Sequence, residues 1–453
     1  MVAKDFFGKL SESVDRTGSA LCVGLDPRPQ NLPDRFKLFS DPLLEWNLHV
    51  IESTEGLAAA YKPNIAFYEA LGRAGFDLLK RTIDAIPLDT PVILDAKRGD
   101  IGSTAEAYAR AVFDVWGVDA VTVNPFLGRD SIKPFVERVD KGVFLLCHTS
   151  NQGASDVQEV PSPVEPLYIR MAREIHRWSD YGNVGLVVGA TFPESIAYVR
   201  EVSPEAWMLI PGVGAQGGDL ERAVRSGKRS DGKGVLVNVS RGISLAPYAR
   251  EAAEQFHRRI SEALESPALP PEPLALTLVD DLFELGAVQF GDFLLASGRR
   301  SSVYIDLRRI IGDPGTMRKM ASLYASQIAG MPRKPDLIAA VPYGALPIAT
   351  VVSQATGLPL IYPRKEVKDH GTRQPIEGVY SAGKRAVLVE DLVTSGGSVL
   401  EAAEKLRSEG IEVTDAVVYL DRESGAGERL REAGISLHAA LKLSQLLERA
   451  KSR

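Results

Sequence analysis

Charged residues alternate in sign over one short run, Asp95-Ala96-Lys97-Arg98-Gly99-Asp100, directly after an apolar segment. Asp95 and Lys97 are two residues apart, so both side chains point to the same face of a strand. Gly99 allows the chain to turn back, and we expect Asp100 to approach the other two charges. Because a cluster of opposite charges contributes little net stability to a fold, the run predicts a site that binds a ligand.

A second motif of this kind lies in the C-terminal half, where an apolar run leads into the acids Glu390 and Asp391 and then the loop Thr394-Ser395-Gly396-Gly397-Ser398. Backbone N–H groups from Ser395 to Ser398 would face a concavity at a helix N-terminus, an arrangement that binds phosphate. The two acids could hold ribose hydroxyls or a nearby Mg²⁺ ion. An acidic turn with an N-cap serine is the alternative interpretation.

The elements that must position the first motif are eight short apolar runs separated by segments of helical length. They cover residues 20–26, 59–62, 92–97, 120–124, 143–148, 184–190, 207–212 and 234–240. Eight strands in about 245 residues predict an α/β fold with a (β/α)₈ TIM barrel. Polar residues follow most of these strands, where barrel enzymes place their active sites. These residues are Asp26, Lys62, Asp95, Lys97, Asn124, Ser150, Gln216 and Arg241.

A proline-rich stretch divides the chain. Residues 266–273 contain four prolines and read as a stiff linker, so we expect one domain at 1–265, a linker at 266–275 and a second domain at 276–453. In the second domain, strand and helix candidates alternate at 336–341, 345–356, 360–362, 385–390, 397–408 and 414–420. This order predicts a smaller doubly wound parallel sheet with ligands at the carboxyl ends of its strands.

Composition excludes several other classes of protein. The 453 residues carry a net charge of −6, which argues against a nucleic-acid surface, and no apolar stretch is long enough to span a bilayer. Cys22 and Cys147 lack any pairing or metal-ligand spacing, so both should be small buried side chains. The first residues are too charged for a signal peptide, and we expect a cytoplasmic protein that binds small molecules, without nucleic-acid or membrane partners.

The C-terminal half resembles the type I phosphoribosyltransferases through the acid pair and the loop described above. The segment from Arg364 to Gly371 and Val341-Pro342-Tyr343-Gly344 narrow the resemblance to orotate phosphoribosyltransferase. It implies that Lys365, Lys368 and His370 neutralise departing pyrophosphate, with Lys368 and His370 catalytic and Arg364 at the substrate. Arg422 would bind the orotate carboxylate, and Mg²⁺ would be bound mainly through phosphoribosyl pyrophosphate. Ala296 departs from the family pattern, in which many members have a lysine beside Ser-Gly.

The N-terminal half resembles orotidine 5′-monophosphate decarboxylase through Asp95-x-Lys97-x-x-Asp100-Ile101, Lys62-Pro63-Asn64 and Asn238-Val239-Ser240-Arg241-Gly242. The resemblance implies a catalytic network of four charged residues and no cofactor. These are Lys62, Asp95, Lys97 and Asp100. Lys97 would stabilise and protonate the carbanion left at C6 of the pyrimidine. The substrate-binding residues implied are Asp26, Thr104, Asn124, Ser150, Gln216, Arg241 and Gly242. Asp100 and Thr104 would enter a neighbouring subunit's site, which implies a homodimer or higher oligomer.

Together the two halves predict a bifunctional enzyme that converts orotate and phosphoribosyl pyrophosphate into orotidine 5′-monophosphate and then into uridine 5′-monophosphate (UMP). Two alternatives remain at this point. The barrel could decarboxylate a keto-sugar phosphate, chemistry that requires Mg²⁺ for an enediolate. The C-terminal half could instead sense phosphoribosyl pyrophosphate without turnover.

Overall fold

A computed structural model of the protein describes residues 5–160, 165–178, 180–213, 217–294, 300–364 and 375–451. The chain divides near Pro271 into two compact units. Helix α11 (Ala249–Glu265) ends the first unit's regular structure, and α12 (Leu274–Glu284) begins that of the second. Residues 266–273 between them form neither helix nor strand, as four prolines in this stretch require.

The first unit is built on eight parallel strands in the order β2-β1-β8-β7-β6-β5-β4-β3. Parallel bridges Tyr61↔Val92 and Asn64↔Asp95 join the first and last strands of this order, so the sheet is a nearly closed barrel and the predicted fold is confirmed. The strands are β1 (Leu21–Leu25), β2 (Ala60–Pro63), β3 (Ile93–Arg98), β4 (Ala120–Val123), β5 (Gly142–His148), β6 (Val184–Val188), β7 (Met208–Ile210) and β8 (Val235–Val239).

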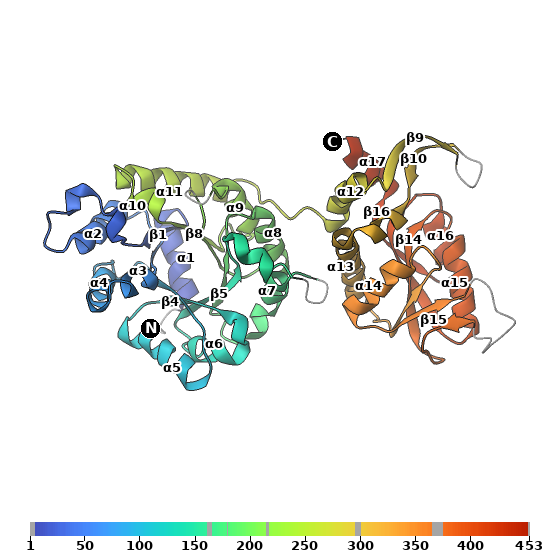
Figure 1. The fold of residues 1–453 in the computed structure, drawn as a ribbon, viewed down its shortest axis with the longest axis horizontal. Helices are drawn as coiled ribbons and strands as arrows, with labels where there is room; N and C mark the ends of the chain where they lie inside the picture. The colour runs from blue at the N-terminus through green and yellow to red at the C-terminus, as the bar shows by residue number, and fades with distance from the viewer. Residues whose placement is uncertain are drawn as a thin grey trace. The chain divides into compact units, whose positions relative to one another are not determined.

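Helices surround this barrel because each crossover between parallel strands must cover the outer face of the sheet (Figure 1). Besides α11, they are α1 (Phe6–Thr17), α2 (Pro42–Thr54), α3 (Ile65–Glu69), α4 (Arg73–Asp84), α5 (Gly102–Arg110), α6 (Arg129–Val136), α7 (Leu167–Trp178), α8 (Pro193–Val202), α9 (Leu220–Gly227) and α10 (Arg241–Ser244). Short helical turns lie at Pro29–Asn31, Asp34–Phe36, Ala111–Val115, Pro125–Leu127 and Gln152–Asp156.

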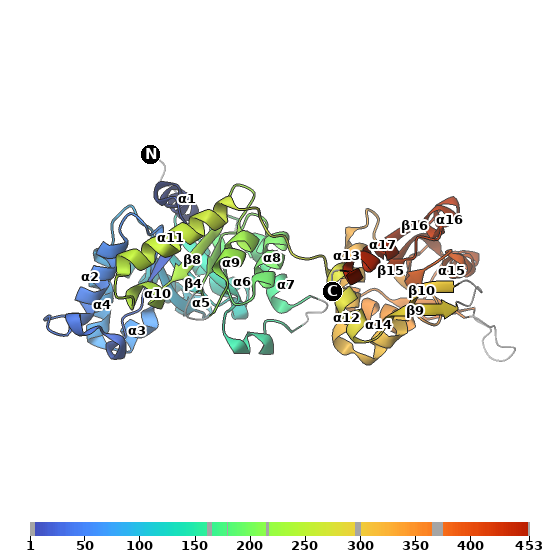
Figure 2. The ribbon, with the colours of Figure 1, turned by 90° about the horizontal axis from the view of Figure 1, so that it is seen from above.

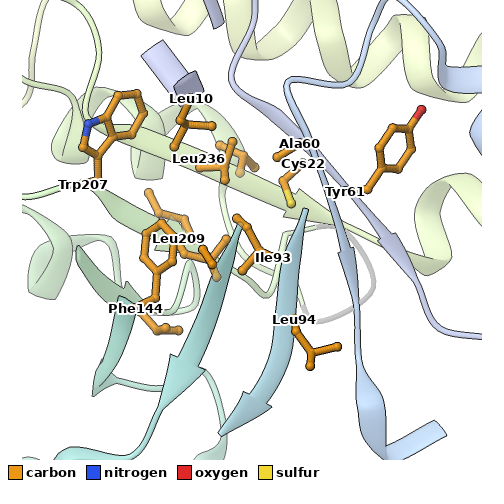
Figure 3. Close-up of a cluster of buried hydrophobic side chains, with 14 of the residues drawn as sticks. Leu10, Cys22, Ala60, Tyr61, Ile93, Leu94, Phe144, Trp207, Leu209 and Leu236 are labelled. Atoms are coloured by element: carbon orange, nitrogen blue, oxygen red, sulfur yellow. The ribbon is translucent and has the colours of Figure 1, made fainter. Parts of the chain in front are cut away.

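Helix α1 covers the end of the barrel at which the strands begin. Ser13 Oγ donates to the carbonyl of Ala59, just before β2, and Lys9 Nζ donates to Asp119, just before β4. Figure 3 shows Leu10 of α1 among side chains from the strands, including Ile93 and Leu209. The strand beginnings are therefore sealed by apolar packing. Cys22 and Cys147 are both buried and unpaired, as predicted.

The second unit contains a six-stranded sheet in the order β13-β12-β11-β14-β15-β16, parallel except for the edge strand β13. A separate antiparallel hairpin pairs β9 with β10 (Figure 2). The strands are β9 (Val288–Leu294), β10 (Arg300–Ile305), β11 (Leu337–Ala340), β12 (Leu360–Pro363), β13 (Ile376–Glu377), β14 (Arg385–Val393), β15 (Glu412–Asp421) and β16 (Ser436–Lys442).

Successive residues of the central strands enter two separate cores, as the two-residue period of a strand requires. Ile338 and Val387 pack in one core with α13, whereas Leu337 and Leu388 pack in the other with α15. The sheet is thus covered on both faces, and the predicted doubly wound architecture is confirmed. The remaining helical segments are η6 (Leu307–Gly312), α13 (Pro314–Gly330), α14 (Leu346–Thr356), α15 (Gly397–Ser408), α16 (Ala426–Glu432) and α17 (Leu443–Lys451).

Among the described residues, none of the helices combines the length and apolarity required to span a bilayer.

Candidate functional site

A cavity of about 510 Å³ opens at the carboxyl ends of the barrel strands, within the size range of small-molecule sites. It is lined by residues from strand ends and the loops that follow them. The residues predicted from the sequence that line it are Asp26, Lys62, Asp95, Lys97, Ser150, Arg241 and Gly242. Residues as far apart in the sequence as Asp26 and Gly242 therefore meet at one site, because all strands of the barrel run in the same direction.

Asp95 lies at the centre of the charged groups in this cavity. Its Oδ2 accepts from Lys62 Nζ at 2.8 Å and from Asn64 Nδ2 at 3.4 Å. Its Oδ1 accepts from Lys97 Nζ at 2.5 Å and from Thr122 Oγ1 at 2.9 Å. Each oxygen of this buried carboxylate thus accepts from one ammonium group and one neutral donor.

The two lysines differ in their exposure to solvent. The Lys62 side chain is 5% exposed and that of Lys97 is 48% exposed, while the Asp95 side chain between them is 11% exposed. Burial opposes the charged form of Asp95, but attraction to Lys62 and Lys97 outweighs it and holds the pKa of the carboxyl below its usual range. Burial likewise disfavours charged Lys62, but Asp95 and Asp26 outweigh it and raise the pKa of its ammonium. Asp95 and Lys62 are therefore both charged near neutral pH.

Asp26 lies on a neighbouring part of the cavity wall, at the end of β1. Its Oδ2 accepts from Ser240 Oγ at 2.6 Å, whereas its buried Oδ1 has no hydrogen-bond partner among the residues that the structure describes. Gly24 permits this contact, because a Cβ at that position would lie 2.6 Å from Ser240 Cβ. The unpartnered carboxylate oxygen is available to accept a hydrogen bond from a ligand hydroxyl.

Three predicted residues of the barrel do not line this cavity. Asp100 Oδ1 accepts from the N–H of Ile101, so the structure does not show the expected approach of Asp100 to Asp95 and Lys97. The left-handed residue in this run is Lys97, with φ of 46°, and not Gly99. Asn124 caps the turn that follows β4, and Thr104 is exposed in the first turn of α5. Gln216 lies outside the described residues.

The cavity also contains polar and aromatic residues to which the sequence analysis gave no role. Arg28 stacks over the ring of Phe67, 4.1 Å from its centroid, and Gln158 accepts from the N–H of Thr149 at 2.8 Å. Asn238 and Thr122 also face the cavity. A polar residue at an inward position of an otherwise apolar strand, as in Ala120-Val121-Thr122-Val123, is the sequence signal that could have identified Thr122.

In the second unit, a cavity of about 500 Å³ is bordered by Glu390 and Asp391, as predicted, together with Asp306 and Tyr343. The predicted strand 385–390 continues to Val393, so the two acids lie within β14 and not beyond it. Tyr324 Oη donates to the carbonyl of Glu390 at 2.6 Å and holds this part of the strand from the α13 side.

The predicted phosphate loop has the expected form. Gly396 adopts a left-handed conformation with φ of 77°, and α15 begins at Gly397 without a side-chain cap. Uncapped N–H groups at the start of a twelve-residue helix can bind phosphate oxygens.

The other described residues predicted for the second unit do not line the cavity that Glu390 and Asp391 border. Ser398 and Arg364 line a smaller cavity of about 120 Å³. Thr394 and Ser395 line neither cavity, and the N–H of Arg422 donates to the carbonyl of Val393 at 2.9 Å. The remaining predicted residues, and the departure at position 296, lie outside the described residues. They are Lys365, Lys368, His370 and Ala296.

Each of the two units matches a known protein family. A model of the orotidine 5′-phosphate decarboxylase / HUMPS family matches residues 19–256, and one of the phosphoribosyl transferase domain matches residues 311–433. The bifunctional enzyme PyrF/PyrE of Nostoc sp. is 37% identical over 457 residues, which cover 97% of this chain and 95% of that protein. The orotidine 5′-phosphate decarboxylase of Herpetosiphon aurantiacus is 47% identical over 260 residues, covering 55% of this chain and 96% of that protein.

Among solved structures, the UMP synthase of Leishmania donovani is 42% identical and has a TM-score of 0.55, with 99% of this chain and 96% of that chain covered. The chain therefore belongs to the bifunctional PyrF/PyrE family, in which an orotidine 5′-phosphate decarboxylase / HUMPS domain is joined to a phosphoribosyl transferase domain.

Proposed function

We propose that this chain catalyses two consecutive steps of UMP synthesis. The C-terminal domain, residues 276–453, joins orotate to phosphoribosyl pyrophosphate and releases pyrophosphate. The N-terminal domain, residues 1–265, then decarboxylates orotidine 5′-monophosphate to UMP. The observation that carries the proposal is Lys97 held at 2.5 Å by buried Asp95 in the barrel cavity.

In the decarboxylation, the bond between C6 and the carboxylate carbon breaks, CO₂ leaves and the electron pair stays on C6. The half-exposed ammonium of Lys97 stabilises this developing charge and donates a proton to C6. Asp95 keeps this ammonium in place, and the buried ammonium of Lys62 pairs with the second carboxylate oxygen of Asp95. All bonds are accounted for by substrate, Lys97 and solvent, which reprotonates the lysine.

The rest of the cavity binds the nucleotide so that C6 meets Lys97. Asp26, with its unpartnered Oδ1, accepts from a ribose hydroxyl, and Ser150 contacts the pyrimidine. Arg241 and Gly242, with Gln216, bind the 5′-phosphate. Binding at the phosphate, remote from the bond that breaks, fixes the reactive orientation of the base.

In the transferase, Glu390 and Asp391 bind the ribose of phosphoribosyl pyrophosphate, and the loop from Thr394 to Ser398 binds its phosphate. Arg422 binds the orotate carboxylate, with Arg364 nearby, while Lys365, Lys368 and His370 neutralise departing pyrophosphate.

Magnesium fits the carboxylates of this cavity. Mg²⁺ is commonly held by one or two carboxylates together with substrate phosphates, and Glu390 and Asp391 supply two carboxylates at one cavity. When bound with pyrophosphate, it neutralises charge on the leaving group. Among the described residues, no group of three or more His, Cys, Asp or Glu side chains forms a metal site by itself.

We also propose a homodimer in the cytoplasm, in which Asp100 and Thr104 reach the partner's barrel site. Exposed apolar side chains follow the neighbouring strands β3 and β4. Ile101, after β3, is 59% exposed, and Phe126, after β4, is 76% exposed. A dimer interface over these loops would remove both from water and would give Asp100 and Thr104, which do not line their own cavity, a role.

The test supplies orotate, phosphoribosyl pyrophosphate and Mg²⁺ and follows CO₂ together with both nucleotides. The native protein should release CO₂ and form UMP. Lys97→Ala should accumulate orotidine 5′-monophosphate, with decarboxylation lowered by at least about 10²- to 10⁴-fold. Lys133→Ala, which removes an exposed lysine of α6, is the matched control and should behave as native. UMP formation at the native rate by Lys97→Ala would refute the proposed role of Lys97.

The same assay separates the alternative reactions. Decarboxylation of supplied orotidine 5′-monophosphate should continue in EDTA, whereas decarboxylation of a keto-sugar phosphate would stop. Pyrophosphate release should accompany nucleotide formation, which a non-catalytic sensor would not produce.

A further inference from the structure

Thr122 of β4 is buried beside the charged residues of the barrel and uses its whole hydrogen-bonding capacity on them. Its Oγ1 donates to Asp95 Oδ1 at 2.9 Å and accepts from the N–H groups of Ala96 and Lys97, each at 3.0 Å. A hydroxyl has one donor and two acceptor positions, and all three are occupied.

The two backbone contacts compensate for an irregularity in β3. The pairing of β3 with β4 shifts register between Leu94 and Arg98, and Lys97 has φ of 46°, an uncommon value for a residue with a side chain. The displaced N–H groups of Ala96 and Lys97 donate instead to the Thr122 side chain. A buried N–H group needs such a partner.

The same hydroxyl also acts at the other end of the Lys97 side chain. Asp95 Oδ1, which accepts from Thr122, is the oxygen that accepts from Lys97 Nζ at 2.5 Å. The backbone of Lys97 and the partner of its ammonium are therefore both fixed to one oxygen atom.

We propose that Thr122 is a positioning residue for decarboxylation, because its hydroxyl holds both ends of the Lys97 side chain where the reaction needs its ammonium. This inference rests on the function proposed for Lys97. Thr122 acts through Lys97 and Asp95, not on the substrate. The alternative is that Thr122 merely fills space in the strand, in which case its methyl group would matter and its hydroxyl would not.

Three substitutions separate these alternatives. Thr122→Ser keeps Oγ and loses the methyl group, Thr122→Ala loses both, and Thr122→Val keeps the shape and loses the hydroxyl. Thr54→Val is the matched control, since Thr54 is a buried residue at the end of α2 whose hydroxyl contacts the carbonyl of Val50 and the hydroxyl of Tyr61, neither of which lines the cavity. The Ser and Ala variants differ only by the hydroxyl, so they decide the question even if the Val variant does not fold.

The rate must be measured per competent site, because a folding defect alone would lower the number of sites. Titration with UMP counts the sites and gives their affinity, and the decarboxylation kcat is then divided by that count. We expect the Ala and Val variants to bind UMP with native affinity and to lose roughly 10- to 100-fold in kcat per site, the scale of a small misplacement of a reacting group. Thr122→Ser and Thr54→Val should keep the native rate per site.

A native rate per site in Thr122→Ala would overturn the inference, as would an equal loss in the Ser and Ala variants. Native protein and Lys97→Ala are measured in the same series. A native protein that releases no CO₂, or a Lys97→Ala variant as fast as native, would instead refute the proposed function. The transferase rate of each preparation shows that the chain itself is intact.

Discussion

Replacing Lys62 by methionine should destabilise the barrel by an amount that can be worked from its contacts. Lys62 Nζ lies 2.8 Å from Asp95 Oδ2, with the two side chains only 5% and 11% exposed. Removing one partner of a buried ion pair typically costs about 3–5 kcal/mol, because it leaves the other charge uncompensated. Since Lys97 Nζ still lies 2.5 Å from the other carboxylate oxygen, we expect the lower end, about 3 kcal/mol.

Tryptophan fluorescence reports on this barrel alone. All 4 tryptophans of the chain, Trp46, Trp116, Trp178 and Trp207, lie in the N-terminal half. For a domain of this size, a loss of about 3 kcal/mol lowers the thermal midpoint by roughly 6–12 °C. Thermal unfolding followed by tryptophan emission should show this shift in Lys62→Met.

Lys80→Met is the matched control for this measurement. Lys80 pairs with Asp84 on the exposed face of α4, where an ion pair contributes at most about 0.5 kcal/mol. Its midpoint should stay close to native. If Lys62→Met unfolds at the native temperature, or shifts no more than Lys80→Met, the buried pair does not stabilise the barrel and the argument from its burial is wrong.

Acid should narrow the difference in the free energy of unfolding between native protein and Lys62→Met. The folded-state pKa of Asp95 is lowered, so the stabilisation that its charge provides is present above about pH 4. This stabilisation is lost as the pH falls through the lowered pKa. Calorimetry or fluorescence melts across this range measure the difference, and a difference that stays constant or widens in acid would refute this linkage. EDTA should stop formation of orotidine 5′-monophosphate from orotate while leaving its decarboxylation intact, as product chromatography would show. Mixing Lys97→Ala with Asp100→Ala should restore CO₂ release above either alone if Asp100 serves the partner's site, and no recovery despite demonstrated subunit exchange counts against the shared site. Gly24→Ala should raise KM for orotidine 5′-monophosphate, because its Cβ would lie 2.6 Å from Ser240 Cβ; an unchanged KM would show that the Ser240 contact with Asp26 does not affect binding.

The barrel was predictable because its strands are buried on both faces and therefore read as continuous apolar runs. The eight predicted runs coincide with the eight strands to within about two residues at each end. In the second unit, β16 was not predicted, because its residues Ser436–Lys442 mix polar and small side chains at a sheet edge. An edge strand has a neighbouring strand on one side only and is less buried, so fewer of its residues need to be apolar.

The charged residues of the site were predictable because Lys and Asp within a strand are conspicuous, whereas Thr122 was not. Threonine is common in strands for its branched Cβ, so its type carries no sign of function. Only the register shift in β3 reveals that its hydroxyl replaces a strand partner. The structure does not show Asp100 approaching Asp95 and Lys97 within one chain; the left-handed residue of the run is Lys97, whereas the sequence alone favoured a turn at Gly99.

Lys62 and Lys97 share the carboxylate of Asp95 but differ in burial, and this difference explains which of them can act on a substrate. Lys62 is enclosed, its ammonium is held charged by Asp95 and Asp26, and giving up its proton would remove the positive charge beside the buried carboxylate of Asp95. Lys97 approaches the same carboxylate from the cavity side and is half exposed, so a substrate can reach it and solvent can return its proton. Lys62 therefore helps to keep the buried Asp95 ionised, and in the proposed decarboxylation an ionised Asp95 would direct Lys97 toward C6. On this reasoning the Lys62→Met variant should lose activity by misplacing Lys97, even at temperatures where the barrel remains folded.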